Sequence, residues 1–118
     1  MSHASVRLVR DDEGSGGVLT LAIVAMVVCA VLAVLPLSAA LAAARRAAVA
    51  SDAAALAAAD AVLGVVSGEP CGWAAKVAAA HRVALTACRV DGAEVVVSVR
   101  TNAGSLPVES SSRAGPPR

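Results

Sequence analysis

The residues with the most chemical potential in this chain are two cysteines and a histidine in its C-terminal half. Cys71 and Cys88 lie on either side of His81. A structural zinc site takes four closely spaced ligands, and no fourth candidate stands near these three residues. A serine or cysteine nucleophile needs an adjacent base, yet the two histidines, His3 and His81, fall on opposite sides of a long apolar run. We therefore predict no catalytic residue, no metal site and no cofactor.

The charged residues indicate neither a substrate site nor a nucleic-acid site. Asp52 and Asp60 are eight residues apart, and without convergent polar groups we interpret them as solvated side chains rather than an acid–base pair. The formal net charge is +1, which gives no electrostatic case for binding nucleic acid. These features predict a protein that is not an enzyme and binds no nucleic acid.

The element that must position everything else is an uncharged run from Val18 to Ala44, followed at once by Arg45 and Arg46. A bilayer core is about 30 Å thick and requires roughly 20 apolar helical residues. At about 1.5 Å per residue this run would reach about 40 Å, enough for a tilted span or one that emerges beyond the lipid. We predict a leader at residues 1–17, a transmembrane helix at 18–44 and a small domain at 45–102.

The orientation of this span rests on the cysteines. Arginines flank it equally, two on each side, so the excess of positive charge that marks a cytoplasmic side does not decide the direction. Paired cysteines persist in oxidising compartments, and Cys71 and Cys88 both follow the span. We expect them to form a disulfide outside the cytoplasm, which places the leader in the cytoplasm of a single-pass cell-membrane protein. Cys29, inside the span, is expected to stay unpaired.

Beyond Arg46 the helix is predicted to continue through an alanine-rich segment to Val66, with at most a bend at Pro36. Gly64, Gly68 and Pro70 then end it. At 100° per residue one side of this segment carries Arg45, Val49, Asp52, Leu56, Asp60 and Leu63. The other side carries Ser51 and a smooth face that we interpret as a surface for close packing against a helix or sheet: Ala47, Ala50, Ala54, Ala58 and Ala61.

A second helix is predicted over 73–83, followed by strands at 85–90 and 93–100 around the turn signal Asp91-Gly92. Pairing outward from that turn sets Val90 opposite Ala93 and Arg89 opposite Glu94. One face of this hairpin then holds Thr86, Cys88, Val90, Val95, Val97 and Val99.

The fold class is therefore α+β: a long N-terminal helix, a short helix and a β-hairpin. The last part, residues 103–118, is rich in Ser and Pro and is predicted to be a flexible tail. Within it, residues 106–112 are the segment that would add an edge strand.

Two stretches resemble a known family. The segment Ser51-Asp52-Ala53-Ala54-Ala55-Leu56-Ala57-Ala58-Ala59 is similar to the signature just outside the membrane in TadE/TadG-like proteins of tight-adherence (Flp) pili, which are pilin-like. The pattern Cys71, Cys88-Arg89-Val90-Asp91-Gly92 and the ending Arg113-Ala114-Gly115-Pro116 resemble a short actinobacterial branch encoded near secretion genes.

This resemblance implies a minor pseudopilin, whose partners are the membrane, other pilin-like subunits and secretion-system membrane proteins. It also implies that a prepilin peptidase cuts the leader, and the candidate sites are Gly14, Gly16 and Gly17. Pilins usually carry Glu five residues past the cut, where this chain has Leu19, Leu21 or Ala22. A permanently anchored assembly factor is the other form that the family role can take.

A rival interpretation is a small secreted protein whose signal peptide is cleaved near Ala40. Pro36 followed by Ser38-Ala39-Ala40 resembles the small-residue cleavage pattern. The apolar run is longer than a signal peptide needs, and acidic residues stand where positive charge is expected. The N-terminus of the mature protein distinguishes the two interpretations.

Overall fold

The computed structural model describes the backbone of residues 3–117 and the side chains of residues 14–117. The fold is α+β, as predicted, and the chain divides into two units, Met1–Leu37 and Ser38–Arg118. In chain order the elements are α1 (His3–Val62), α2 (Pro70–Ala80), β1 (Ala84–Asp91), β2 (Glu94–Ala103) and β3 (Leu106–Ala114).

Helix α1 includes the predicted span and most of the alanine-rich segment, with Pro36 inside it, but it ends at Val62 rather than at the predicted Val66. It begins at His3 rather than at Val18, because the predicted leader contains no proline to stop a helix; Met1 and Ser2 lie outside the described residues. Between Val18 and Leu37 its large apolar side chains are 49–72% exposed. Residues 14–62 are long and apolar enough to cross a membrane, which is compatible with a single-pass membrane protein.

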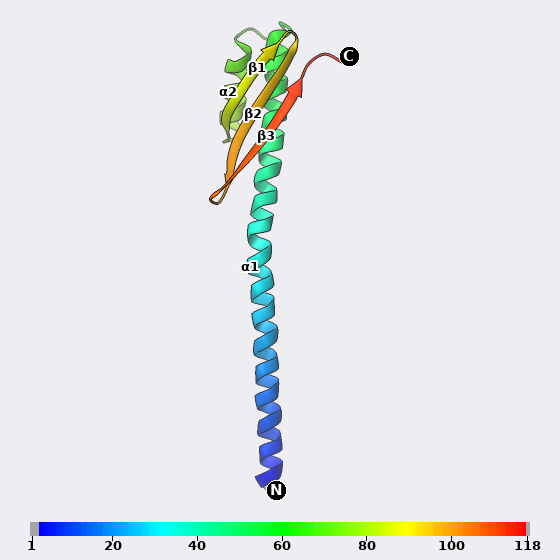
Figure 1. Ribbon diagram of the computed structural model, residues 1–118, viewed down its shortest axis with the longest axis vertical. Coiled ribbons are helices and arrows are strands. Elements are labelled where there is room, and N and C mark those ends of the chain that lie inside the picture. The colour runs from blue at the N-terminus through cyan, green and yellow to red at the C-terminus, as the bar shows by residue number, and fades with distance from the viewer. Residues whose placement is uncertain (1–2, 118) are drawn as a thin grey trace. The chain divides into compact units, whose positions relative to one another are not determined.

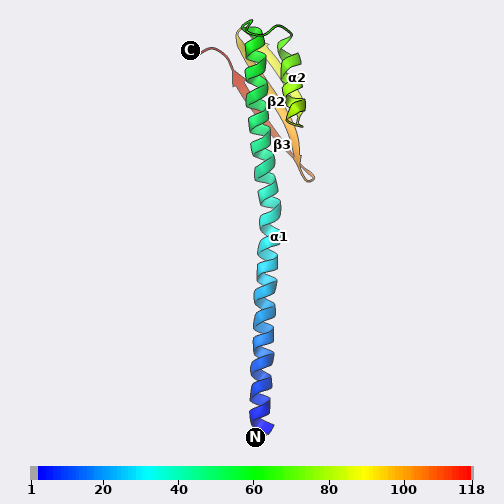
Figure 2. The ribbon, with the colours of Figure 1, turned by 180° about the vertical axis from the view of Figure 1, so that it is seen from behind.

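In the second unit the three strands form one antiparallel sheet in the order β1-β2-β3. Helices α1 and α2 both lie on the same face of this sheet (Figures 1 and 2), and the opposite face carries exposed polar side chains such as Arg89, Arg100 and Ser111. The unit therefore has two layers and a single core between them.

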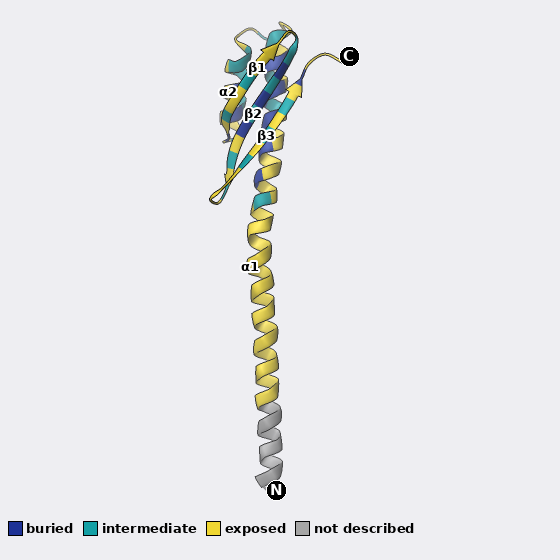
Figure 3. Cartoon of the chain, in the orientation of Figure 1, coloured by how far each residue is buried: buried dark blue, intermediate teal, exposed yellow. Residues whose placement is uncertain are grey.

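The core forms where the alanine face of α1 meets the central strand. Ala47, Ala50, Ala54 and Ala58 are fully buried, and Ala61 is half-buried. The four fully buried alanines belong to one cluster with the buried valines of β2: Val95, Val97 and Val99. Figure 3 shows this buried strip in dark blue along α1 and β2. In this chain the alanine face packs against the sheet of the same unit; its use in contacts with a neighbouring subunit stays a prediction.

The hairpin register differs from the prediction by two residues. We expected Val90 opposite Ala93, but the turn residues are Gly92 and Ala93, and Asp91 stays in the strand. Gly92 takes the positive φ of 60° that the first position of this turn requires. The observed Cα partners are Asp91–Glu94, Val90–Val95, Arg89–Val96 and Cys88–Val97. A two-residue shift keeps each side chain on its face, which is why the valines of β2 are buried as expected.

Two side chains of the hairpin are placed differently from the prediction. The expected pair Arg89–Glu94 is absent, because Arg89 faces Val96 in the register and Glu94 lies 3.6 Å from Arg113 of β3. A bulge between Leu85 and Ala87 leaves Thr86 exposed. The bulge changes the strand's alternation, so Leu85 rather than Thr86 packs against the core.

Helix α2 begins and ends three residues before the predicted range 73–83. Glu69 caps its start: the Glu69 carboxylate accepts hydrogen bonds from the backbone amides of Cys71 and Gly72 at 3.0 and 2.5 Å. Pro70 suits the first helical position because its missing N–H is not needed there. The helix ends before Arg82, whose φ of 58° is left-handed.

The expected flexible tail is wrong for residues 106–114, which form the third strand. Gly104, with φ 63°, makes the tight turn from β2 into β3. Alternate residues of β3 then face the helices and are buried or half-buried: Val108, Ser110, Ser112 and Ala114. A serine-rich segment has the composition of a disordered tail. Here, however, the inward hydroxyls form hydrogen bonds within the fold.

A leucine on the alanine face should destabilise the domain. Ala54→Leu would insert three carbon atoms between α1 and β2, and overpacking of this kind typically costs about 1–3 kcal/mol. The measurement is urea unfolding of the detergent-solubilised chain, followed by the fluorescence of Trp73. Ala48→Leu, at an exposed position of the same helix, should change the free energy of unfolding by less than about 0.5 kcal/mol. Equal effects of the two variants would contradict the packing described here.

Candidate functional site

The predicted disulfide is present between Cys71 and Cys88, with the two Cα atoms 5.8 Å apart. It joins the first turn of α2 to β1 and closes a loop of 17 residues. Cys29 is free and exposed in the apolar part of α1. Among the described residues, no group of three or more His, Cys, Asp and Glu side chains is arranged to hold a metal ion.

A buried serine connects α1 to the last strand. The Ser51 hydroxyl is fully buried and lies 3.1 Å from the Ser110 hydroxyl and 2.9 Å from the Ser112 hydroxyl. Ser51 also donates to the carbonyl of Ala48 at 3.0 Å, and Ser112 donates to the carboxylate of Asp52. The network thus links Ser51 and Asp52 of α1 to Ser110 and Ser112 of β3.

The opposite side of α1 is exposed. All six residues predicted to share this side are exposed, and we call them the outer face: Arg45, Val49, Asp52, Leu56, Asp60 and Leu63. Its three apolar members, Val49, Leu56 and Leu63, recur every seven residues and are 57%, 61% and 54% exposed. An apolar stripe at heptad spacing is the pattern by which one helix packs along another.

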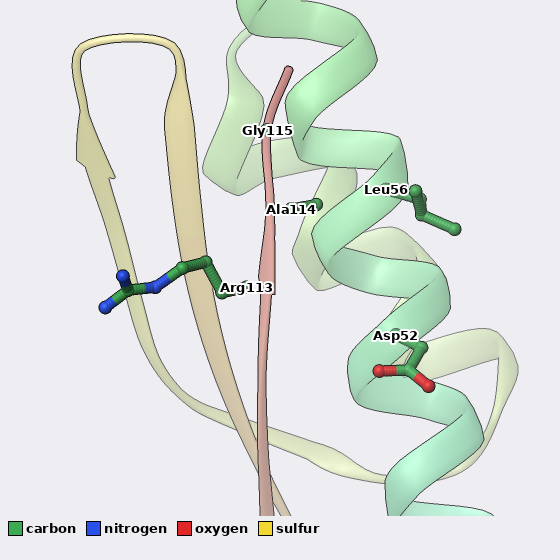
Figure 4. A pocket seen from close by; sticks show the side chains of 5 residues that line it. All are labelled: Asp52, Leu56, Arg113, Ala114 and Gly115. Atoms are coloured by element: carbon green, nitrogen blue, oxygen red, sulfur yellow. The ribbon is translucent and has the colours of Figure 1, made fainter. Parts of the chain in front are cut away.

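A groove of about 380 Å³ lies between the outer face and the end of β3. Figure 4 shows Asp52 and Leu56 projecting from α1 beside the strand, with Ala114 turned toward the helix and the Arg113 side chain directed away from it. The groove thus offers one carboxylate and one leucine side chain. It lacks the convergent polar groups that fix a small-molecule substrate.

The three candidate cleavage glycines lie within α1, and no other part of the chain that the structure describes packs against them. A Cβ atom built on Gly14, Gly16 or Gly17 meets no atom within 4 Å. Packing within the chain therefore does not require glycine at these positions. Whether a peptidase recognises them stays a prediction.

Sequence reasoning placed Ser51 on the small-residue face but gave it no role, because residues 106–112 were expected at most to add an edge strand within a flexible tail. One signal was available. From Val108 to Ala114 every second residue is small or apolar, which is the alternation of a half-buried strand. Ser51 is the polar member of the buried face, and a buried hydroxyl requires a partner.

Comparisons with known proteins leave the chain without an assigned family. No family model, curated protein or solved structure matches it. The functional argument therefore rests on the residues and their arrangement.

Removing the disulfide should destabilise the second unit. A bond that closes a loop of this length stabilises a fold by about 3 kcal/mol in the chain-entropy model, so Cys71→Ala should lower the free energy of unfolding by about that amount. Urea unfolding with and without a reductant measures it. Reductant should weaken the wild type and leave Cys71→Ala unchanged, whereas Cys29→Ala should behave as the wild type. A wild type insensitive to reductant would refute the role of this bond.

Proposed function

We propose that this protein is a non-enzymatic, single-span assembly component of a tight-adherence-type pilus or a related secretion machine. In this role it is a TadE/TadG-like minor pseudopilin that works through helix α1. Its partners are other pilin-like subunits and membrane proteins of the same machine, and a prepilin peptidase if the leader is removed.

The observation that carries this proposal is the double use of α1. From Val18 to Leu37 the helix exposes large apolar side chains and carries no charge, as a helix in lipid does. From Ala43 to Ala59 the same helix supplies the buried core of a small domain. A helix that leaves the membrane and becomes the spine of its own domain is the architecture that the pseudopilin resemblance implies.

The disulfide supports an extracytoplasmic domain. Structural disulfides persist in oxidising compartments and are rare in the cytosol, and the Cys71–Cys88 bond lies within the second unit. A cytoplasmic leader followed by a span and an oxidised domain gives the single-pass orientation that we propose.

The outer face is the surface through which we propose that neighbouring subunits pack. The alanine face is occupied by the sheet of the same chain, so assembly requires another surface. The outer face provides exposed apolar side chains at Val49, Leu56 and Leu63. Arg45 at one end and Asp52 and Asp60 further along give it charges of both signs, which suits pairing with a helix of complementary pattern.

The mature N-terminus tests the proposal against the secreted alternative. Cleavage after Ala40 would remove none of the buried residues, the first of which is Ala43, so both forms are compatible with the folded domain. We expect intact mass measurement of protein from its native host to show an N-terminus at Met1 or near Gly14–Gly17, in protein that resists alkaline extraction from membranes. An N-terminus near Leu41 in soluble protein would establish the secreted alternative.

Replacing the central leucine of the outer face should block assembly without unfolding the domain. Leu56→Lys puts a cation four residues from both Asp52 and Asp60, a spacing that supports a helix, but it removes the apolar contact. Chemical cross-linking in membranes should show at least a tenfold loss of cross-linked species, about 1.4 kcal/mol. Val90→Lys, at an exposed apolar residue of β1, is the matched control. Normal cross-linking of Leu56→Lys would exclude the outer face as the assembly surface.

A further inference from the structure

The turn between β2 and β3 forms an uncharged tip on the second unit. Residues 101–108, Thr-Asn-Ala-Gly-Ser-Leu-Pro-Val, contain no charged side chain, and we call them the hairpin tip. Leu106 is 65% exposed, and Pro107 beside it is exposed as well. Leu106 is thus a large apolar side chain that the described part of the chain leaves mostly uncovered.

A charged pair marks the boundary of the hairpin tip. Arg100 of β2 and Glu109 of β3 are Cα partners, and their side chains form an ion pair at 2.6 Å. Both side chains are more than half exposed. Both strands therefore carry a charged residue at this pair and none between the pair and the turn.

The hairpin tip lies beside the first turns of α1 in the second unit. Strand β3 runs in the same direction as α1, because Ser51 contacts Ser110 and Ser112, while Leu56 shares a groove with residues 113–115. At about 3.3 Å per strand residue, the tip lies about 15 Å before the contact with Ser51. The same distance along α1, at about 1.5 Å per helical residue, leads back from Ser51 to residues 40–43. Ala43 is buried and Ala40 half-buried at this level, and Figures 1 and 2 show the turn beside α1.

Helix α1 also changes from uncharged to charged residues beside the hairpin tip. No charged residue lies between Val18 and Ala44, and Arg45 and Arg46 follow, both exposed. Leu41 is 57% exposed. A hollow of about 320 Å³ lies on the helix surface here. It is lined by Ser38, Leu41, Ala42 and Arg45.

The length of the apolar run places this level at the surface of the bilayer. A core of about 30 Å takes about 20 helical residues, which the segment 18–37 supplies. Residues 38–44 are then the remainder, about 10 Å of helix. That is the depth of the headgroup and acyl boundary on one side of a membrane.

We propose that the hairpin tip is a second membrane contact, in which Leu106 inserts into the lipid interface beside residues 38–44 of α1. Arg45 and Arg46, which directly follow the apolar run, bind the phosphates of anionic lipids just above it. The second unit thereby contacts the bilayer through two segments, the hairpin tip and residues 38–44 of α1. This inference rests on the proposed single span.

Tryptophan quenching by brominated lipid tests the contact. The full chain is reconstituted in liposomes of phosphatidylcholine with one quarter phosphatidylglycerol, with bromine on the acyl carbons near the headgroup. Leu106→Trp should be quenched at least twofold more than wild type, whose Trp73 gives the baseline, and its emission should shift to the blue. Val65→Trp is the matched control, because Val65 is 70% exposed and follows the far end of α1.

Ser105→Trp, in the same turn, is a second reporter that should also be quenched. Leaving out phosphatidylglycerol, or changing Arg45 and Arg46 to Gln, should reduce the quenching of Leu106→Trp. Emission that is blue-shifted but not quenched would show protein covering the tip and would overturn the lipid contact, as would quenching equal to that of Val65→Trp. If alkaline washing removes the wild-type chain from the liposomes, the single-span proposal fails; if the chain is retained and the tip reporters are unquenched, only this inference fails.

Discussion

The contact between the alanines of α1 and the valines of β2 is the interaction on which the second unit depends. The chain has one aromatic residue, so it cannot fill a wide core with large rings. It solves the problem by bringing backbones together: alanine lets the sheet approach the helix closely, and Val95, Val97 and Val99 fill the remaining space. Because each alanine buries little area, stability must come from many close contacts and from a covalent bond. The disulfide between α2 and β1 supplies that bond.

The sequence predicted which helices and strands form more accurately than where each of them begins and ends. Helix α1, the alanine face and the Cys71–Cys88 bond followed from periodicity and cysteine placement. The turn failed because Asp91-Gly92 fits two turn geometries, and Gly92 has a positive φ in both. They differ at Asp91, which stays in the strand and does not take a positive φ. The strand β3 was foreseen only as an edge strand that residues 106–112 could add within a flexible tail, because its inward serines have buried partners only when Ser51 is opposite them. The partners of a polar residue are tertiary information that composition does not contain.

The packing also reassigns the two sides of α1. Helical periodicity separates the alanines from the side of Val49 and Leu56, and the structure keeps that separation residue by residue. Smoothness alone suggested that the alanine side was free for a partner. The sheet takes it because β2 presents three inward valines that need a close, flat surface. The side left exposed is mixed in charge and apolar character, as surfaces that must stay soluble before they associate tend to be.

The contacts between the Ser51 hydroxyl and those of Ser110 and Ser112 join residues about sixty positions apart in the chain. Contacts of such long sequence separation form late, because the intervening chain must first lose its freedom. The apolar helix is complete once α1 has been synthesised, whereas the strand that contacts Ser51 is made later, after α2, β1 and β2. The order of synthesis therefore separates two events in time: the helix is available to enter lipid while the alanine face still waits for its last strand.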